Sequence, residues 1–411
     1  MSPAIDGPRL LQRLAALADI GRQPSGACCR LALTDADREG RDQVVAWMRE
    51  LGLAVSVDPI GNIFGLRAGR NPALAPVMTG SHIDTVRTGG AYDGNLGVLA
   101  GLEVVAALND AGVETERGLV VGVFTDEEGA RFAPDMLGSL VFVGGLALDD
   151  ALAIRAIDGA ILGEELQRIG YAGTAPLGLP RPHAYVELHI EQGPVLDAEG
   201  IRIGAVEDLQ GISWQALHIR GQSNHAGTTP MRLRHDAGYA AARVACFVRE
   251  LAIEMGGSQV ATVGKVDLVP NLVNVIAAQA TLTVDLRNTD EVLLRSAESR
   301  LADFLLQLAD TEGVSIERRP LARFEPVSFD PGIAARIEAV ADRLGLSRRR
   351  MTSGAGHDAQ MLARICPTAM IFVPSVGGIS HNPAEHTEPD DLLAGAQVLL
   401  GTLLALCNEG D

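Results

Sequence analysis

Histidine and carboxylate side chains stand directly after apolar runs in this chain, and these residue types bind divalent metal ions. The branched run Val77-Met78-Thr79 is followed by His82, then by Asp84 and Asp93. From an extended segment, Asp84 can project the same way as His82 and accept the free ring N–H of that histidine, which would fix its tautomer. Asp93 is a candidate for a carboxylate that bridges two divalent ions.

Two adjacent glutamates follow a second apolar run, Leu119 to Phe124. Neighbouring residues point in different directions on any regular backbone, so one of Glu127 and Glu128 can bind a metal ion while the other stays free for proton transfer. In open α/β sheets ligands bind beyond the carboxyl ends of the strands, so these segments are expected to converge on one pocket. A solvated Glu-Glu pair or an incidental His-x-Asp explains each piece alone, but their combination favours a metal site.

The elements that must position these residues have the pattern of an α/β protein. Short apolar runs alternate with helical patterns such as Leu96 to Leu108, which predicts a largely parallel sheet covered on both faces. Tyr185 to Glu191 differs, because its polar and apolar residues alternate. A period of two puts His189 on a polar face, although a hydrogen-bonded core histidine is the alternative for this residue alone.

From about Ile212 to Pro320 the pattern changes to the β-α-β-β-α-β order of a ferredoxin-like unit. The expected elements are strands at Ile212–Arg220, Val260–Leu268, Val273–Leu286 and Val314–Arg318, and helices at His235–Met255 and Glu291–Ala309. We therefore predict an α/β domain made of residues 1–210 and 323–411, interrupted by a small inserted domain at 211–322.

The composition limits the number of domains, the kinds of partner that this chain can bind and its location. The 411 residues are enough for two domains, each with its own core. With 52 acidic against 34 basic residues the net charge is −18, which disfavours nucleic acids and anionic membranes. Five scattered cysteines favour a reducing compartment, and neither a signal-peptide pattern nor a stretch of roughly 18 uncharged apolar residues is present. The predicted location is the cytoplasm.

Eight segments carry a family resemblance over nearly the whole chain. They are TGSHIDTVRTGGAYDGNLGV (79–98), FTDEEGARF (124–132), ELHIEQGPVLD (187–197), GQSNHAGTTPM (221–231), PNLVNVIA (270–277), DLRN (285–288), SGAGHDAQ (353–360) and GGISHNPAEHT (377–387). With these motifs the sequence resembles the amidase/hydantoinase/carbamoylase branch of the M20 metallopeptidase-like family.

The resemblance implies two divalent ions per subunit, which in this branch are zinc, manganese, nickel or cobalt. The implied metal ligands are His82 and His189 on one ion, Asp93 as the bridge, and Glu128 and His381 on the other ion. His381 is preferred to His386 because the family ligand is the histidine before Asn-Pro-Ala-Glu. Glu127 then becomes the general base. Mixed histidine and carboxylate ligands accept several ions, so the sequence does not choose among them.

The resemblance also implies that the α/β domain is catalytic and that the inserted domain is a lid. It implies a homodimer formed through this lid domain, with His225 reaching into the partner's site to stabilise oxyanion charge. The implied substrate-binding residues are Gln192, Asn274 and Arg287, with His357 completing the pocket. An arginine fork pairs well with a substrate carboxylate. The ordinary alternatives are a backbone cap for His225 and a surface ion pair with Asp285 or Glu291 for Arg287.

The predicted activity is metal-dependent hydrolysis of the terminal ureido (N-carbamoyl) C–N bond of a small molecule with a free carboxylate. N-carbamoyl-L-amino acids are preferred because that substrate range is the broadest in the branch, and the products would be an amino acid, carbon dioxide and ammonia. Allantoate amidohydrolase and β-ureidopropionase are alternatives with the same ligands. An M20 dipeptidase or aminoacylase, or a catalytically silent metal-binding dimer, is disfavoured by the ureido-branch motifs and by Glu127 beside a complete ligand set.

Overall fold

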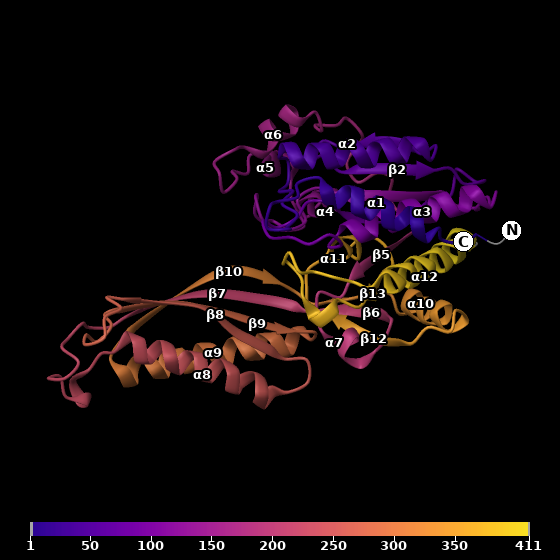
Figure 1. Cartoon of the computed structure of the whole chain (residues 1–411). Helices are drawn as coiled ribbons and strands as arrows, with labels where there is room; N and C mark the ends of the chain where they lie inside the picture. The colour runs from indigo at the N-terminus through magenta and orange to yellow at the C-terminus, as the bar shows by residue number, and fades with distance from the viewer. Residues whose placement is uncertain (1–2, 410–411) are drawn as a thin grey trace. The chain divides into compact units, whose positions relative to one another are not determined.

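The computed structural model describes residues 3–409, which form two compact units with separate sheets (Figure 1). Unit 1 extends to Glu207 and resumes at Phe329, and unit 2 is the continuous stretch Asp208–Ser328. Unit 1 is built on a nine-stranded mixed sheet and unit 2 on a four-stranded antiparallel sheet. The predicted α/β class, with an inserted βαββαβ unit, is confirmed.

Four parallel strands form the centre of the nine-stranded sheet, in the order β4 (Leu119–Phe124), β3 (Val77–His82), β5 (Ala184–Ile190) and β13 (Thr368–Val373). All four are buried along their whole length, as expected for strands covered on both faces. The register places His82 level with Phe124 and His189 level with Phe372. The flanking strands are β1 (Ala54–Val57), β2 (Ile63–Arg67), β6 (Ile203–Leu209), β11 (Val327–Ser328) and β12 (Arg348–Ser353).

Strand β5 has the predicted polar and apolar sides, and its polar side is buried as well. Glu187 on that side accepts hydrogen bonds from the hydroxyl groups of Ser81 (2.7 Å) and Tyr185 (3.1 Å), and from the backbone N–H of Ala359 (3.0 Å). The alternation therefore marks a polar face that is buried inside unit 1, and His189 lies on it as predicted.

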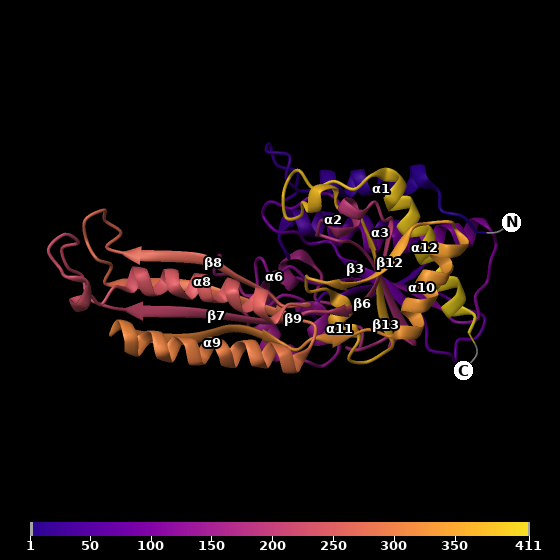
Figure 2. The same ribbon diagram turned by 90° about the horizontal axis from the view of Figure 1, so that it is seen from below.

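Helices cover the sheet of unit 1 (Figure 2). They are α1 (Gly7–Asp19), α2 (Asp35–Glu50), α3 (Asn95–Asp110), α4 (Leu137–Phe142), α5 (Leu148–Leu152), α6 (Leu162–Ile169), α7 (Val195–Glu199), α10 (Pro331–Arg343), α11 (Asp358–Leu362), α12 (Pro389–Cys407) and the 3₁₀ turn η2 (Val376–Gly378). By length and composition alone, α12 is the one helix within residues 3–409 that could cross a membrane. Most of it is buried against α3, α10 and β13, so it is a core helix.

Unit 2 has the strand order β10-β7-β9-β8, with α8 and α9 along one face (Figure 1). Its elements are β7 (Gly211–Arg220), η1 (Met231–Leu233), α8 (Ala237–Met255), β8 (Val260–Val269), β9 (Gln279–Asn288), α9 (Glu291–Glu312) and β10 (Ser315–Phe324). The carboxylates of Asp236 and Asp290 cap the first backbone N–H groups of the two helices, which fixes where each helix begins.

Two strand boundaries in unit 2 differ from the sequence prediction. Strand β9 begins at Gln279 instead of Val273, because the preceding segment pairs with the loop that carries His225. The backbone N–H of Ala226 donates to Asn274 (3.0 Å), and that of Ile276 donates to Asn224 (2.9 Å). Strand β10 runs to Phe324 and is longer than expected.

Candidate metal centre

The ligands predicted within unit 1 lie together at the carboxyl ends of its parallel strands. His82 is the last residue of β3 and His189 the next-to-last residue of β5, while the two glutamates follow β4 directly. Asp93 comes from the loop between β3 and α3, and His381 from the loop before α12. This is the sheet edge at which ligands bind in open α/β folds.

Asp93 stands at the centre of the cluster, with a histidine on each carboxylate oxygen. Its Oδ1 lies 3.2 Å from Nε2 of His189 and 3.6 Å from Nε2 of His82. Its Oδ2 lies 3.2 Å from Nε2 of His381, which is also 3.2 Å from Oε2 of Glu128. Two groups of three possible metal ligands therefore share one carboxylate, and within each group the ligand atoms lie within 4.8 Å of one another.

Backbone carbonyl groups orient the two buried histidines. Nδ1 of His82 lies 2.9 Å from the carbonyl oxygen of Asp84, and Nδ1 of His189 lies 2.8 Å from that of Ile190. A carbonyl only accepts, so Nδ1 carries the proton of the neutral ring and Nε2 keeps its lone pair toward Asp93. The backbone N–H of Gly94 donates to Nε2 of His189 (3.2 Å), which agrees with this tautomer.

The prediction for the Asp84 side chain is wrong. Its carboxylate lies 3.8 Å from Nδ1 of His82, too far for a hydrogen bond. The backbone carbonyl group of Asp84 accepts the Nδ1–H hydrogen bond instead. The two carboxylate oxygens accept the backbone N–H groups of Glu127 (3.2 Å) and Glu128 (3.3 Å). Asp84 therefore fixes the loop that carries both glutamates.

Burial and close contact shift the pKa values of the carboxylates and imidazoles in this cluster. Burial raises the pKa of Glu127 well above its usual range, and the nearby carboxylates of Asp358 and Glu128 raise it further. Burial alone would raise the pKa of Asp93, but hydrogen bonds donated by the protonated forms of the surrounding histidines bring it well below the ordinary value. Hydrogen bonds to Asp93 and Glu128 raise the pKa of His381 to about 10.

The donor atoms fit divalent cations. Oε1 of Glu128 is buried and has no hydrogen-bond partner within the described part of the chain, so the carboxylate has coordinating capacity left over. Imidazole nitrogen with carboxylate oxygen is the ligand set of zinc, manganese and related ions. The cluster is therefore a candidate metal centre.

Backbone conformations that the sequence could not reveal support the cluster. Gln192 (φ 57°) and His381 (φ 53°) adopt left-handed conformations that are uncommon for residues with a side chain. Such strained residues gather at functional sites. Gly94 has φ 65°, and a Cβ there would lie 2.4 Å from Cε1 of His82, so glycine lets this loop approach the ring.

Three further residues of unit 1 surround Asp93. Nε2 of Gln192, a predicted substrate-binding residue, donates to Oδ2 of Asp93 (2.9 Å). The hydroxyl group of Ser380 lies 3.3 Å from the same oxygen. Oε1 of Glu385 accepts the backbone N–H of Asp93 (3.2 Å). The sequence interpretation missed Ser380 and Glu385, although both stand in the quoted motif with His381.

The other predicted histidines of unit 1 have different surroundings. His357 is buried, its ring centroid lies 4.5 Å from that of His189, and its Nε2 lies 3.0 Å from the hydroxyl group of Ser353. Burial and the neighbouring His189 hold the pKa of His357 well below its usual range, which favours the neutral ring, and this ring packs against His189. Nε2 of His386 lies 3.5 Å from Glu388, outside the cluster.

The substrate-binding residues predicted in the lid lie in unit 2. His225 is exposed, and its Nδ1 accepts the backbone N–H groups of Gly227 (3.0 Å) and Thr228 (3.2 Å). Its proton is therefore on Nε2, which faces outward as a donor. Arg287 forms an ion pair with Asp285 (2.9 Å), as the ordinary alternative predicted, and its guanidinium carbon lies 5.7 Å from the ring centre of Trp214.

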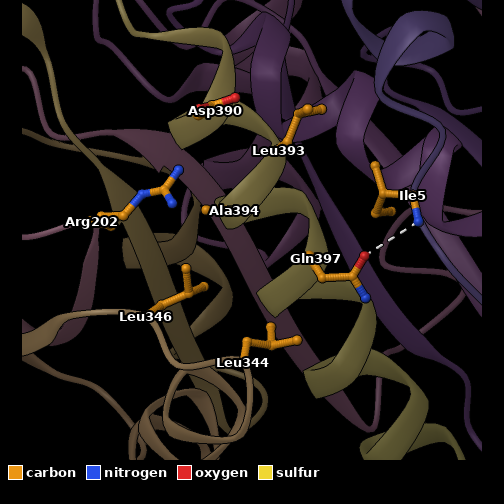
Figure 3. A pocket seen from close by; sticks show the side chains of 8 residues that line it. All are labelled: Ile5, Arg202, Leu344, Leu346, Asp390, Leu393, Ala394 and Gln397. Carbon is orange, nitrogen blue, oxygen red and sulfur yellow. Dashed lines mark hydrogen bonds between the residues drawn. The ribbon is translucent and has the colours of Figure 1, made fainter.

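A surface cavity of about 330 Å³ lies elsewhere in unit 1, beside α12 (Figure 3). The backbone N–H of Ile5 donates to Oε1 of Gln397 there (3.3 Å). The cavity is lined by Ile5, Arg202, Leu344, Leu346, Asp390, Leu393, Ala394 and Gln397. None of these residues belongs to the predicted site.

Comparison with known proteins decides the family. Residues 78–405 match the model of peptidase family M20/M25/M40. The chain belongs to this family. It is 42% identical to the N-carbamoyl-L-amino-acid amidohydrolase of Rhizobium meliloti over 97% of this chain and 96% of the relative. It is 38% identical to the allantoate amidohydrolase of Escherichia coli, over 93% and 94% of the two chains.

A solved structure gives the same result at the level of the fold. The amidase of the hydantoinase/carbamoylase family from Burkholderia multivorans is 46% identical, covers 100% of both chains and has a TM-score of 0.97. The resemblance predicted from the motifs is therefore confirmed for this M20 chain.

Proposed function

We propose that this M20 protein is a metal-dependent amidohydrolase that cleaves the terminal ureido C–N bond of N-carbamoyl-L-amino acids. The observation that carries the proposal is the buried Asp93 carboxylate shared by two groups of metal ligands, with Glu127 beside them. The relative from Rhizobium meliloti, which spans nearly the whole chain, supports the choice of substrate class.

Two divalent ions would occupy the cluster. His82, His189 and Asp93 would hold one ion, and Asp93, Glu128 and His381 the other, with zinc, manganese, nickel or cobalt as suitable ions. When bound, such ions supply Lewis acidity to the substrate carbonyl and make an attacking water easier to deprotonate.

Glu127 is placed to move the proton. Its Oε2 lies 3.4 Å from Nε2 of His82, yet Glu127 belongs to neither three-ligand group. It would take a proton from the water that attacks the carbamoyl carbon and return it to the departing nitrogen, as a general acid–base does. One water is consumed, and the products are the amino acid, carbon dioxide and ammonia.

Gln192 offers a reason for preferring a ureido group. Because a carboxylate only accepts, the contact with Asp93 fixes Nε2 of Gln192 on that side and turns Oε1 the other way. Oε1 is buried and has no hydrogen-bond partner among residues 3–409. The terminal NH₂ of a carbamoyl group would supply the missing donor, whereas an acetyl group has none. Leaving such a buried acceptor unpaired costs about 1–3 kcal/mol.

Unit 2 would complete the site from a second subunit. The outward Nε2–H of His225 suits the stabilisation of oxyanion charge, and Asn274 lies on the segment paired with the His225 loop. Arg287 would bind the substrate carboxylate after exchanging its ion pair with Asp285. We therefore propose a homodimer formed through unit 2, with His225 acting in the partner's site.

Complementation tests action across the dimer. Glu127→Ala and His225→Ala should each be inactive alone. Co-expressed, they should regain activity, because one site in each mixed dimer then combines an intact Glu127 with an intact His225. A protein that is monomeric by light scattering, or mixed dimers without activity, would refute the assignment.

A substrate panel tests the activity itself. Protein loaded with Mn²⁺ or Zn²⁺ is given N-carbamoyl-L-methionine, N-carbamoyl-β-alanine or allantoate, and ammonia is measured. The highest kcat/KM is expected for N-carbamoyl-L-methionine. A preference for allantoate would assign the activity of the Escherichia coli relative instead, and no ammonia from any of the three would refute ureido hydrolysis.

We also propose a cytoplasmic location and no nucleic-acid or membrane partner. All five cysteines are free thiols, as in a reducing compartment, and the net charge is −18. Cell fractionation that recovers the protein with membranes or with nucleic acid would contradict this.

A further inference from the structure

One buried carboxylate outside the proposed ligand set joins two loops of the metal centre. Glu385 is 7% exposed and lies four residues after His381. Its Oε1 accepts the backbone N–H groups of Tyr92 (2.9 Å) and Asp93 (3.2 Å), nearly three hundred residues earlier in the chain. Its Oε2 accepts the hydroxyl group of Ser380 (3.1 Å). Glu385 thus links the loop of the bridging carboxylate to the loop of His381.

The packing around Glu385 leaves it little freedom. A Cβ on Gly90 would lie 2.2 Å from the carboxyl carbon of Glu385, so the two loops approach closely at that glycine. The backbone N–H of Glu385 donates to the carbonyl group of Asn382 (3.0 Å), which closes a turn in the His381 loop. With the N–H of Asp93 held, the backbone that aims the Asp93 carboxylate is also fixed.

The two proposed ions depend unequally on this link. His82 and His189 lie on buried strands, and backbone carbonyl groups hold their rings without any help from Glu385. The side chain of His381, in contrast, is 49% exposed, sits on a loop in a left-handed conformation, and has no such carbonyl contact among those described for residues 3–409. Its position relative to Asp93 therefore depends on the contacts between the two loops.

We propose that Glu385 is a positioning residue that sets the distance between Asp93 and His381, so that its loss weakens the ion held by Asp93, Glu128 and His381 more than the ion held with His82 and His189. This inference rests on the two-ion site proposed above. It adds a residue that touches neither ion, and it acts through the backbone of Asp93.

Metal titration tests this without any substrate. Metal-stripped protein is titrated with Mn²⁺ by calorimetry, and the bound metal is then counted by elemental analysis. Wild type should bind two ions. Glu385→Ala should keep the affinity for one ion within about threefold and lower the affinity for the other about 10–100-fold, as losses around metal ligands do. At saturating Mn²⁺ its KM should stay near that of wild type while kcat recovers.

Two variants control for general damage. In Glu385→Gln the amide oxygen can still accept both backbone N–H groups while the NH₂ group faces Ser380, so both affinities should stay within about threefold of wild type. Glu388→Ala removes an exposed carboxylate from the same segment and should change neither affinity. Wild-type binding of both ions by Glu385→Ala overturns the inference, and so does equal weakening of both ions or a Gln variant as damaged as Ala.

The outcomes for this residue and for the activity stay separable. A wild-type protein that binds two ions but releases no ammonia from any ureido substrate would refute the proposed function and leave the role of Glu385 intact. A wild-type protein that binds fewer than two ions would refute both.

Discussion

Replacing Gly94 with alanine tests how closely the metal centre is packed. Gly94 and Gly112 flank the two ends of α3 with nearly equal positive φ angles, 65° and 63°. The ψ of Gly94 is −47°, outside the left-handed region, so an alanine there costs more than the roughly 1–2 kcal/mol of an ordinary left-handed residue. A Cβ on Gly112 meets no atom within 4 Å, whereas one on Gly94 would lie 2.4 Å from the ring of His82. Gly112→Ala is thus a control for a positive φ without a steric clash.

The clash at Gly94 sets the size of the effect. Ordinary contact begins near 3.4 Å, so the loop and the ring of His82 must separate by about 1 Å. A displacement of about 1 Å within a catalytic arrangement can lower the rate by about 100-fold. We expect Gly94→Ala to lose more thermal stability than Gly112→Ala, and only Gly94→Ala to lose about 100-fold in kcat and to bind the His82 ion more weakly.

Calorimetric Mn²⁺ titration and ammonia release measure the two effects. If Gly94→Ala matched Gly112→Ala in metal affinity and in kcat, His82 would not be a ligand whose position depends on this approach. The geometric argument for the centre would then fail.

The remaining predictions concern single side chains. Glu127→Gln should lower kcat by about 10²–10⁴-fold with unchanged metal content by elemental analysis, and a fully active variant would exclude it as the base. His225→Ala should lower kcat by at least about 100-fold with its metal intact, since an oxyanion donor is typically worth about 3–4 kcal/mol; equal turnover would remove that role. Asp84→Asn places an NH₂ group against a backbone N–H of Glu127 or Glu128, so kcat should fall about 10–100-fold. Wild-type kinetics would contradict the role of Asp84 in fixing the loop of the two glutamates. Gln192→Met should lower kcat/KM for an N-carbamoyl substrate about tenfold or more but not for its N-acetyl analogue, and a parallel loss on both would argue against selection of the carbamoyl NH₂.

The strands that carry the metal centre were predictable because their signals are local. Leu119 to Phe124 and Val77 to Thr79 are continuous apolar runs, and strands buried on both faces need such runs. Their order in one sheet then brings His82 and the two glutamates to one edge. The ferredoxin-like unit was predictable for the same reason, since its helical and alternating patterns are long.

Features that depend on contacts distant in sequence could not be predicted. The backbone carbonyl group of Asp84 replaces its carboxylate as the partner of His82. That carboxylate instead accepts hydrogen bonds from two backbone N–H groups some forty residues later. The segment from Val273 has the composition of a strand, but it pairs with the His225 loop instead. The role of Glu385 depends on a loop nearly three hundred residues away, so spacing gives no sign of it.

The insertion of unit 2 between the two parts of unit 1 affects the order of events during synthesis. Unit 2 is one continuous stretch with its own core, so it can fold as soon as it leaves the ribosome. Strand β5, in contrast, must wait for its neighbour β13, and the α12 helix that covers them is made last. At 5–20 residues per second, the 79 residues between Ser328 and Cys407 take roughly 4 to 16 s to translate. Over that interval the nascent chain carries a folded unit 2, while the edge of β5 that will pair with β13 stays open.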